Sequence, residues 1–413
     1  MSEPPPTYHD LLADLDRDLA ERGALGVLVL DASSLGTIED EYGAVAYDEV
    51  RQRVFRVIEE QRGKDFRMGD VAALDSPRGL CLIFFLERKR RRNVPLSLSD
   101  LRAARSRLVG SLLPNLSRTA FPHRKTAPRL DVGYGLAIYN PLLGTARIVS
   151  RAVEDALKQA VHQRRTDDQV ELERLQDILL RERVVPAYQA ILRLKEGTVM
   201  GFEALARGPR GSGLEAADAL FEAATRHGLL VELDRLCRRR ALLASGRVPS
   251  SARIFVNTLP ATMRDPQFRG KALIDFLDKA RVEPARIVIE ITEKLVIDNY
   301  VLFREAMSYF TDLGMSFAVD DVGAGYSGLE SIAQLKPAFL KVDTALVRDV
   351  HSSPVNEAMV KAIVAIGHGI GATVVGEGIQ SEAEAQALRA MGVDFGQGYH
   401  LARPDAGPEA AGL

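Results

Sequence analysis

The chain has 413 residues, of which 46% are hydrophobic and 27% charged, and its formal net charge is −2. These values are typical of a soluble globular protein with two or three domains, and they give no basic field that would favour a nucleic-acid polymer. The two cysteines, Cys81 and Cys237, exclude a disulfide framework. The apolar runs are too short to cross a bilayer, and the Pro-rich residues 1–7 do not resemble a secretion signal. We therefore expect a cytoplasmic protein without a membrane span.

The first half of the chain alternates between helical and strand patterns. Leucines at helical spacing predict a short amphipathic helix over 8–22. Apolar runs predict strands at 27–31, 79–86 and 132–138, and helical spacing predicts helices at 47–61 and 101–113. A longer helical stretch covers 148–181 and is polar and charged at its middle. We expect the domain boundary in that stretch, where a helix would act as a stiff connector.

From Val184 onward, strand patterns and amphipathic helices alternate. The predicted strands are 187–192, 199–206, 253–257, 287–291, 317–322, 339–343, 373–377 and 396–401. The predicted helices are 215–227, 231–244, 267–280, 300–313, 356–370 and 383–391. This alternation predicts a parallel sheet covered by helices, and its length matches a closed (β/α)8 barrel. The first two strands have no helix between them, which predicts an irregular start of the barrel.

Polar residues interrupt these apolar strands near their carboxyl ends. They are Glu203, Asn257, Glu290, Asp320, Asp321, Lys341, Glu377 and Gln397. In such barrels the carboxyl ends of the strands form the active-site face. A single carboxylate there usually caps a helix or lies in solvent, but several on one mouth repel each other by ~4 kcal/mol per pair at ~4 Å and therefore need cations. Oxygen donors suit Mg²⁺ or Mn²⁺ rather than zinc, and adjacent acids suit two ions.

Residues 323–328 form a GxGxxG sequence that follows a strand and precedes a helix. Alone it would suggest a dinucleotide site. The acids at 320 and 321 would repel a pyrophosphate, however, and the motif lies in the middle of the alternation rather than at the start of a βαβ unit. We therefore interpret the glycines as a loop that bends sharply over the site.

Together these motifs resemble the signature of EAL-domain cyclic di-GMP phosphodiesterases. The matching segments, over about residues 180–405, are Glu203-Ala204-Leu205 with Arg207, Glu290-x-x-Glu293, residues 320–327, 340–343, 377–378, 397–399 and 403–404. The resemblance implies a modified TIM barrel whose first strand runs antiparallel. It also implies hydrolysis of cyclic di-GMP to linear pGpG by a water that two Mg²⁺ or Mn²⁺ ions activate. Val322 stands where phenylalanine is usual in the family, and this departure bears on the glycine loop.

The resemblance also assigns roles to single residues. The metal ligands would be Glu203, Asn257, Glu290, Asp320, Asp321 and Glu377. The catalytic residues would be Glu203, Lys341, Glu377 and Glu293, with Lys341 orienting the water and Glu293 bracing the glycine loop. The substrate would contact Gln189, Leu205, Arg207, Asp343 and Gln397. A homodimer formed through the barrel is expected by the same resemblance.

The first half of the chain resembles a GGDEF domain more weakly, through 27–31, 40–43, 69–71 and 133–137. The signature itself is absent, because residues 75–79 read Asp-Ser-Pro-Arg-Gly. Ser33 also replaces a family acid, and Glu39 stands where a guanine-binding asparagine is expected. We therefore expect no synthesis of cyclic di-GMP, and we interpret this half as a degenerate domain that regulates, dimerises, or binds a regulatory nucleotide or protein.

The expected organisation is an N-terminal helical segment (1–23), a degenerate GGDEF-like α+β domain (24–165), a helical linker (166–183) and an EAL-like barrel (184–413). Two alternatives to an active enzyme stay open. One is a receptor that binds cyclic di-GMP with little or no turnover, and the other is a metal phosphodiesterase for another nucleotide. A receptor would usually lack some of the metal acids, whereas this chain has all of them.

Overall fold

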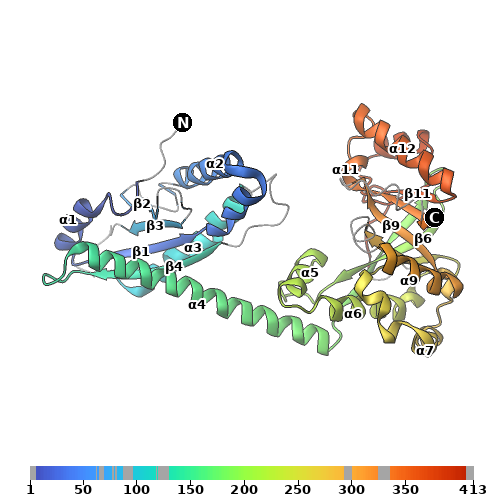
Figure 1. Cartoon of the computed structure of the whole chain (residues 1–413), viewed down its shortest axis with the longest axis horizontal. Helices are drawn as coiled ribbons and strands as arrows, with labels where there is room; N and C mark the ends of the chain where they lie inside the picture. Colours follow the sequence, from blue (N-terminus) through green and yellow to red (C-terminus); the bar gives the residue numbers. More distant parts are fainter. Residues whose placement is uncertain are drawn as a thin grey trace. The chain divides into compact units, whose positions relative to one another are not determined.

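A computed structural model gives the fold of residues 6–61, 63–64, 69–76, 79, 81–86, 96–117, 119, 130–292, 300–323 and 335–405. The chain divides into two compact units, residues 1–170 and residues 171–413 (Figure 1). Among the helices in these ranges, none combines the length and the apolar character that a membrane span requires.

The first unit is built on an antiparallel sheet in the order β2-β3-β1-β4. Its strands are β1 (Ala24–Asp31), β2 (Val71–Leu74), β3 (Cys81–Leu86) and β4 (Asp131–Ile138). Its helices are α1 (Leu12–Arg22), α2 (Thr37–Glu60), α3 (Leu98–Ser117) and the first part of α4 (Thr145–Leu180). Successive side chains of a strand point to opposite faces. Leu28 and Leu30 of β1 accordingly join the core beneath α2 and α3, whereas Val27 and Val29 join the core beneath α1 and α4.

Helix α4 approaches β4 very closely. A Cβ atom at Gly133 would lie 1.9 Å from the Ala156 carbonyl oxygen, and one at Gly135 would lie 2.2 Å from that of Ala152. Glycine is therefore required at both positions, because any side chain would push the helix off the sheet. The long helix predicted over 148–181 is confirmed by α4.

Two elements of the first unit differ from the sequence prediction. Patterning does not predict β2, because two of its four residues are alanines with little strand preference. Helix α2 begins at Thr37 rather than at residue 47. Gly43, with φ of 82°, interrupts its helical geometry and breaks the amphipathic period that a continuous helix would show.

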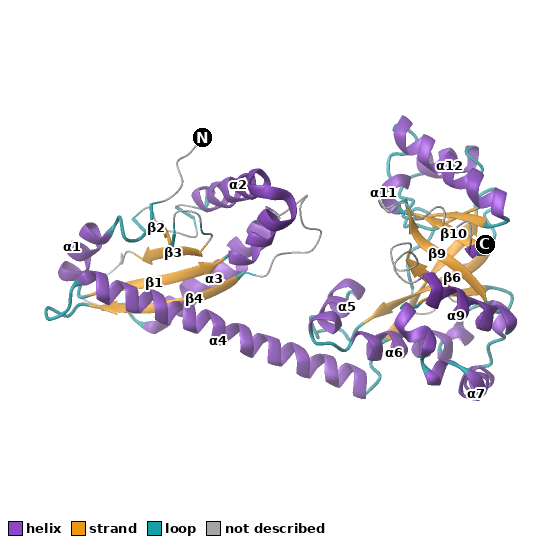
Figure 2. Ribbon diagram, in the orientation of Figure 1, coloured by secondary structure: helices purple, strands orange, loops and turns teal. Residues whose placement is uncertain are grey.

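The second unit is a closed barrel in which the strands follow chain order and β12 returns to β5 (Figure 2). The strands are β5 (Val185–Arg193), β6 (Val199–Arg207), β7 (Arg253–Asn257), β8 (Ile287–Thr292), β9 (Ser316–Val322), β10 (Phe339–Val342), β11 (Thr373–Gly376) and β12 (Phe395–Gly396). β5 is antiparallel to both of its neighbours, and the other pairs are parallel. The expected modified TIM barrel with an antiparallel first strand is thus confirmed.

Helices cover the outside of this barrel. They are α5 (Ala217–Arg226), α6 (Leu230–Leu243), α7 (Gly270–Ala280), α9 (Tyr300–Asp312), α11 (Thr344–Val347), α12 (Pro354–Ile370) and α13 (Glu382–Ala390). Short 3-10 turns lie between some of them, including η4 (Pro260–Arg264) and η5 (Pro266–Phe268). The outward residues of the strands and the apolar faces of the helices form one large core.

The strand predicted over 396–401 is wrong. β12 ends at Gly396, and the chain then follows the segment after β11: Gln397 N donates to the Gly376 oxygen, and His400 N donates to the Ile379 oxygen. A Cβ atom at Gly398 would lie 2.2 Å from the backbone of Ile379. The chain therefore turns against a neighbouring backbone and does not extend the sheet.

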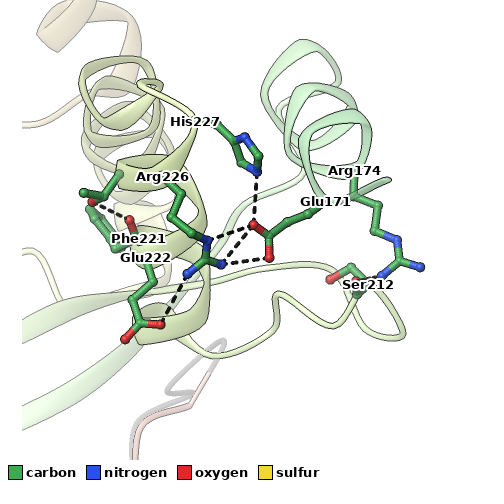
Figure 3. A network of polar contacts seen from close by, with 8 residues as sticks. Glu171, Arg174, Ser212, Phe221, Glu222, Arg226 and His227 are labelled. Atoms are coloured by element: carbon green, nitrogen blue, oxygen red, sulfur yellow. Dashed lines mark hydrogen bonds and ion pairs between the residues drawn. The ribbon is translucent and has the colours of Figure 1, made fainter. Parts of the chain in front are cut away.

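The end of α4 is fastened to α5 by a polar cluster (Figure 3). Glu171 accepts hydrogen bonds from Arg226 through both carboxylate oxygens, at 2.8 to 3.1 Å, and its Oε1 lies 3.0 Å from His227 Nε2. Apolar contacts continue the junction, since Leu175 and Ile178 of α4 share a buried cluster with residues of α5 and α6. Residues 171–180 of α4 are therefore packed firmly against α5.

Candidate active site at the mouth of the barrel

The alternation of side chains along each strand places the polar residues of the mouth. Inside the barrel, an apolar layer is formed by Ile191, Phe255, Val288, Ala318, Phe339, Val375 and Phe395. Each of these residues has a polar residue two positions away along the chain, toward the mouth of the barrel. These polar residues are Gln189, Asn257, Glu290, Asp320, Lys341, Glu377 and Gln397. Because residues i and i+2 share a face, the apolar layer is the floor of the site and the polar residues form the layer above it.

Lys341 lies at the centre of this layer and is fully buried. Its Nζ lies 2.7 Å from Glu377 Oε1, 2.8 Å from Glu290 Oε1, and 3.2 Å from both Glu203 Oε2 and Asp320 Oδ1. These carboxylates come from four different strands or strand ends, so the structure brings together residues that are up to 174 positions apart in the chain (Glu203 to Glu377). An ammonium group has three hydrogens, so it cannot satisfy four carboxylates at once.

The electrostatics of this cluster follow from its burial. Burial raises the pKa of Glu290 well above its usual value, and the neighbouring Glu203 adds to the effect. Burial likewise raises the pKa of Glu377 well above its usual value. For Lys341, burial acts to lower the pKa, but the surrounding carboxylates outweigh it and raise the pKa well above the ordinary range. The ammonium therefore stays charged, while the excess of buried acids favours binding of further positive charge.

Glu203 is the best-supported carboxylate of the mouth. It accepts hydrogen bonds from Asn257 Nδ2 at 2.9 Å and from Gln397 Nε2 at 2.7 Å. Although burial acts to raise its pKa, Lys341 and these two amides lower it below the usual value. Gln397 also donates to Gln189 Oε1 at 3.0 Å, and Gln189 donates to the Ala402 oxygen. Four predicted site residues thus form one hydrogen-bonded chain, in which Glu203 is the charged member and lies between Asn257 and Gln397.

A bulge in β9 presents both adjacent acids to the site. The pairing of β9 with β10 shifts by one residue between Leu340 and Val342, so that Asp320 and Asp321 together lie opposite Lys341. Asp321 has φ of 57°, which is a left-handed conformation that residues other than glycine rarely adopt. In a regular strand two successive side chains would point to opposite faces, so the bulge is what gathers them.

Asp320, Asp321 and Glu377 are the carboxylates that best fit a metal ion within the described part of the chain. One oxygen from each can be chosen so that all three lie within 4.8 Å of one another. Burial, then Asp320 and Asp343, raise the pKa of Asp321 to about 6. Glu290 Oε1 is paired with Lys341 Nζ at 2.8 Å, whereas its buried Oε2 has no hydrogen-bond donor among the described residues. Buried carboxylate oxygens without donors are costly, and an all-oxygen donor set suits hard divalent cations.

The remaining predicted residues lie around the mouth or outside the described ranges. Asp343 accepts a hydrogen bond from Ala345 N and caps α11. Arg207 is partly buried and donates to the Ala206 oxygen. Leu205 lines a cavity of about 380 Å³ beside Asn257 and Glu290, between β6, β7, α5 and α6. Glu293 and residues 324–328 of the glycine loop lie outside the described residues; Val322 is buried in β9.

Two buried charged residues of α6 that line this cavity, Asp234 and Arg238, are not predicted from the sequence. Both are buried, and Thr262 links them: its hydroxyl donates to Asp234 Oδ2 at 2.6 Å and accepts from Arg238 Nη1 at 2.7 Å. Asp234 Oδ1 also accepts from Leu259 N. Charged residues four apart on an amphipathic helix usually form an exposed pair, and the sequence signal was therefore indistinguishable from a solvated face.

Comparisons with known proteins bear on this site. A model of the EAL domain matches residues 172–404. The cyclic di-GMP phosphodiesterase NbdA of Pseudomonas aeruginosa is 25% identical over 413 residues, which is 92% of this chain and 48% of NbdA. The cyclic di-GMP phosphodiesterase PdeR of Escherichia coli is 34% identical over 152 residues, which is 37% of this chain and 23% of PdeR. The chain spans about half or less of the length of the curated relatives it matches.

Solved structures give the same fold. The PaMucR phosphodiesterase in complex with c-di-GMP is 25% identical to this chain, with a TM-score of 0.52, over 57% of this chain and 97% of that one. The fold and the site thus define a modified TIM barrel whose mouth gathers carboxylates around a buried lysine. The chain belongs to the EAL domain family.

Proposed function

We propose that the second unit hydrolyses cyclic di-GMP to linear pGpG. The observation that carries the proposal is the mouth itself: four carboxylates surround one lysine, and Asp321 and Asn257 lie beside these carboxylates, in a member of the EAL domain family. The names of NbdA and PdeR and the ligand of the PaMucR structure support the same substrate. Incubation of the purified chain with cyclic di-GMP and Mg²⁺ or Mn²⁺, followed by chromatography, tests it: an unchanged substrate would refute the activity.

We propose that the residues of the mouth bind two divalent cations, either Mg²⁺ or Mn²⁺. Asp320, Asp321 and Glu377 would hold one of them, and the wider ligand set comprises Glu203, Asn257, Glu290, Asp320, Asp321 and Glu377. When bound, such ions make a water nucleophilic at neutral pH and stabilise the oxygens of an in-line phosphoryl displacement. Glu290 Oε2, which is buried and has no hydrogen-bond donor among the described residues, supports this assignment, because a cation would satisfy it.

The chain's own residues would do the rest. Lys341 contacts four carboxylates and would orient the attacking water. The amide chain of Gln189 and Gln397 fixes Glu203 and offers polar contacts to a nucleotide. Arg207 has a guanidinium whose recorded partner is a backbone oxygen, so it is suited to pair with a substrate phosphate. Leu205 and Asp343 complete the proposed substrate contacts.

Glu293 is proposed to brace the glycine loop. Its replacement with alanine should impair turnover while it leaves more metal affinity than the Glu203→Ala change. Equal loss of metal binding in both variants would refute this division of roles. The alternative function, a receptor without turnover, would instead give tight cyclic di-GMP binding in calorimetry and an intact substrate after incubation.

For the first unit we propose a regulatory role within a degenerate GGDEF-like domain. Its four-stranded sheet with helices on both faces supports the proposal, as does Ser33, which donates to Asp31 at 2.9 Å from its backbone nitrogen. The proposed domain limits are 24–165 for this domain, 166–183 for the linker and 184–413 for the barrel, which is proposed to dimerise. Comparing the rates of the full chain and of a chain without residues 1–165 tests the regulation.

A further inference from the structure

A second cavity lies among the helices outside the barrel, between α6, η5 and α7. Its volume is about 250 Å³, which suits a small molecule rather than a nucleotide. Its walls combine three arginines of α6, at positions 235, 238 and 239, with the rings of Phe268 and Phe276. The proposed substrate site and this cavity share one lining residue, Arg238.

Arg238 is 2% exposed, and part of its hydrogen-bonding capacity is unused. Nη1 donates to Thr262 Oγ1 at 2.7 Å and lies 3.3 Å from Asp234 Oδ2. Nε and Nη2 have no acceptor among the residues that the structure describes. These two nitrogens form one edge of the planar guanidinium, and that edge is the one that binds a carboxylate through two parallel hydrogen bonds. Leaving it unpaired in a buried site is costly.

The outer cavity is lined by Arg238 and by the ring that its guanidinium contacts. The Arg238 Cζ atom lies 4.4 Å from the centre of the Phe268 ring, and Phe268 lines this cavity but not the one at the mouth. Phe268, which is 5% exposed, therefore packs against the guanidinium, and Phe276 adds a second aromatic ring to the lining of this cavity. A ligand that matches both features has a charged head and a flat apolar body.

The charge of the ligand follows from what the neighbouring arginines already bind. Arg235 Nε donates to Asp265 Oδ2 at 2.6 Å, and Arg239 is ion-paired with Glu182. Asp265 also accepts from Gln267 N, and none of its hydrogen bonds comes from Nε or Nη2 of Arg238. Burial lowers the pKa of Arg238, although Asp234 and Asp265 act to raise it, so one more negative charge would stabilise the charged form. A single unpaired guanidinium edge offers one positive charge and two donors, which match a carboxylate monoanion better than a phosphate dianion.

We propose that this outer cavity binds a small organic carboxylate with a flat apolar body, held by the Nε–Nη2 edge of Arg238 and by Phe268 and Phe276. The site is separate from the proposed phosphodiesterase site and does not depend on turnover. Arg238, which the ligand would contact, also lines the mouth cavity and therefore connects the two cavities.

Calorimetry of the full chain with benzoate tests the proposal, in EDTA so that a divalent ion at the mouth cannot recruit the carboxylate. Benzoate should bind once per chain, with a dissociation constant in the millimolar range or below. Benzamide, which has the same shape and no charge, should bind at least about tenfold more weakly, because it lacks the anion. Absence of benzoate binding up to about 10 mM, or equal binding of both probes, overturns the proposal.

Matched variants locate the ligand. Ala272→Leu fills the outer cavity without changing Arg238 and should abolish benzoate binding, whereas Ala217→Leu fills the mouth cavity and should leave it unchanged. The reverse result would place the anion at the mouth and refute the outer site. Arg238→Lys keeps the charge but removes the edge and should weaken binding by about tenfold or more. Circular dichroism checks that each variant folds. If Arg238→Lys does not fold, the result with Ala272→Leu decides the test.

Discussion

Lys341 Nζ lies 2.8 Å from Glu290 Oε1, and both side chains are fully buried. This ion pair is one of four around the same ammonium, since three other carboxylates contact it at 2.7 to 3.2 Å. A buried charge that loses its partner is far more costly than a surface one. The lysine therefore has a structural role that can be separated from any role in chemistry.

Replacing Lys341 with methionine should destabilise the barrel by about 3–5 kcal/mol at neutral pH without metal, because the carboxylates lose their buried counter-charge. The loss should be smaller at pH 5, where Glu290 and Glu377 can take up protons more readily, since burial raises their pKa values. Urea unfolding in EDTA at both pH values measures it. Lys361→Met is the control: its pair with Glu357 is exposed and should contribute less than about 1 kcal/mol. Similar losses for both lysines would contradict the prediction.

Glu203→Ala should abolish cyclic di-GMP turnover and weaken Mn²⁺ binding by about a hundredfold or more, because it removes a proposed ligand, takes the acceptor of Asn257 away and leaves Gln397 with Gln189 alone. Calorimetry with Mn²⁺ alone reports the affinity independently of activity. Glu222→Ala, which removes a carboxylate from the surface of α5, is the matched control and should retain both properties. Wild-type rates in Glu203→Ala would break the proposed ligand assignment.

The metal-free barrel should lose stability as the pH rises from about 4 to about 6, and Asp321 should be one cause. Burial, then Asp320, raise its pKa from 3.8 to about 6, so in this window the folded protein binds more protons than the unfolded chain. Such a group favours the fold at low pH and stops doing so above its folded pKa. Asp321→Asn should therefore flatten the dependence of the urea midpoint on pH in EDTA. An identical slope in the wild type and the variant would contradict this.

Mg²⁺ should reverse the pH effect, because a cation favours the carboxylate form of Asp321 and its neighbours. Adding the ion at pH 7 should raise the urea midpoint of the wild type, and the increase should shrink at pH 5, where protons compete. Ca²⁺ at the same ionic strength is the control. It screens charges equally, but it is larger than Mg²⁺ and accepts a less strict coordination geometry. A midpoint that does not respond to any divalent ion would argue against a metal site in the mouth.

Much of this mouth follows from sequence because the barrel strands have a simple period. Phe255 and Asn257, or Phe339 and Lys341, are two apart, so a predicted strand already places one in the floor and the other above it. The same rule fails at Asp320 and Asp321, which it sends to opposite faces. The bulge and the left-handed Asp321 that reunite them depend on pairing with β10, which no local pattern encodes.

Other features depend on tertiary contacts in the same way. Gln397 reaches Glu203, but through a turn that packs on the backbone of Ile379 rather than through the predicted strand over 396–401. Asp234 and Arg238 carry charges that sequence patterning assigns to solvent, whereas Thr262 on a distant 3-10 turn satisfies both and buries them. Local propensity has no access to such partners, which lie 24 to 28 positions away.

Gly398→Ala should destabilise the mouth, because the added methyl would lie 2.2 Å from the nitrogen and oxygen of Ile379. The turn would have to move, and with it Gln397, which holds Glu203 and Gln189. We expect a loss of about 1–3 kcal/mol in urea unfolding and a weaker affinity for substrate. Gly369→Ala, in α12 and with open space around it, is the control and should be neutral or slightly stabilising. Equal effects of the two changes would contradict the proposed contact.

The contacts of Glu171 with Arg226 and His227 should stabilise α5, which lines the mouth cavity. Glu171 binds Arg226 through both oxygens and contacts His227, and α5 lines that cavity with Phe221 (Figure 3). Glu171→Ala should therefore cost about 1 kcal/mol locally, since the pair is only partly buried, and should speed amide exchange in α5 by about fivefold. Glu222→Ala removes a 3.8 Å contact with the same Arg226 and should leave exchange unchanged. If both variants exchange alike, Glu171 does not fasten the helix.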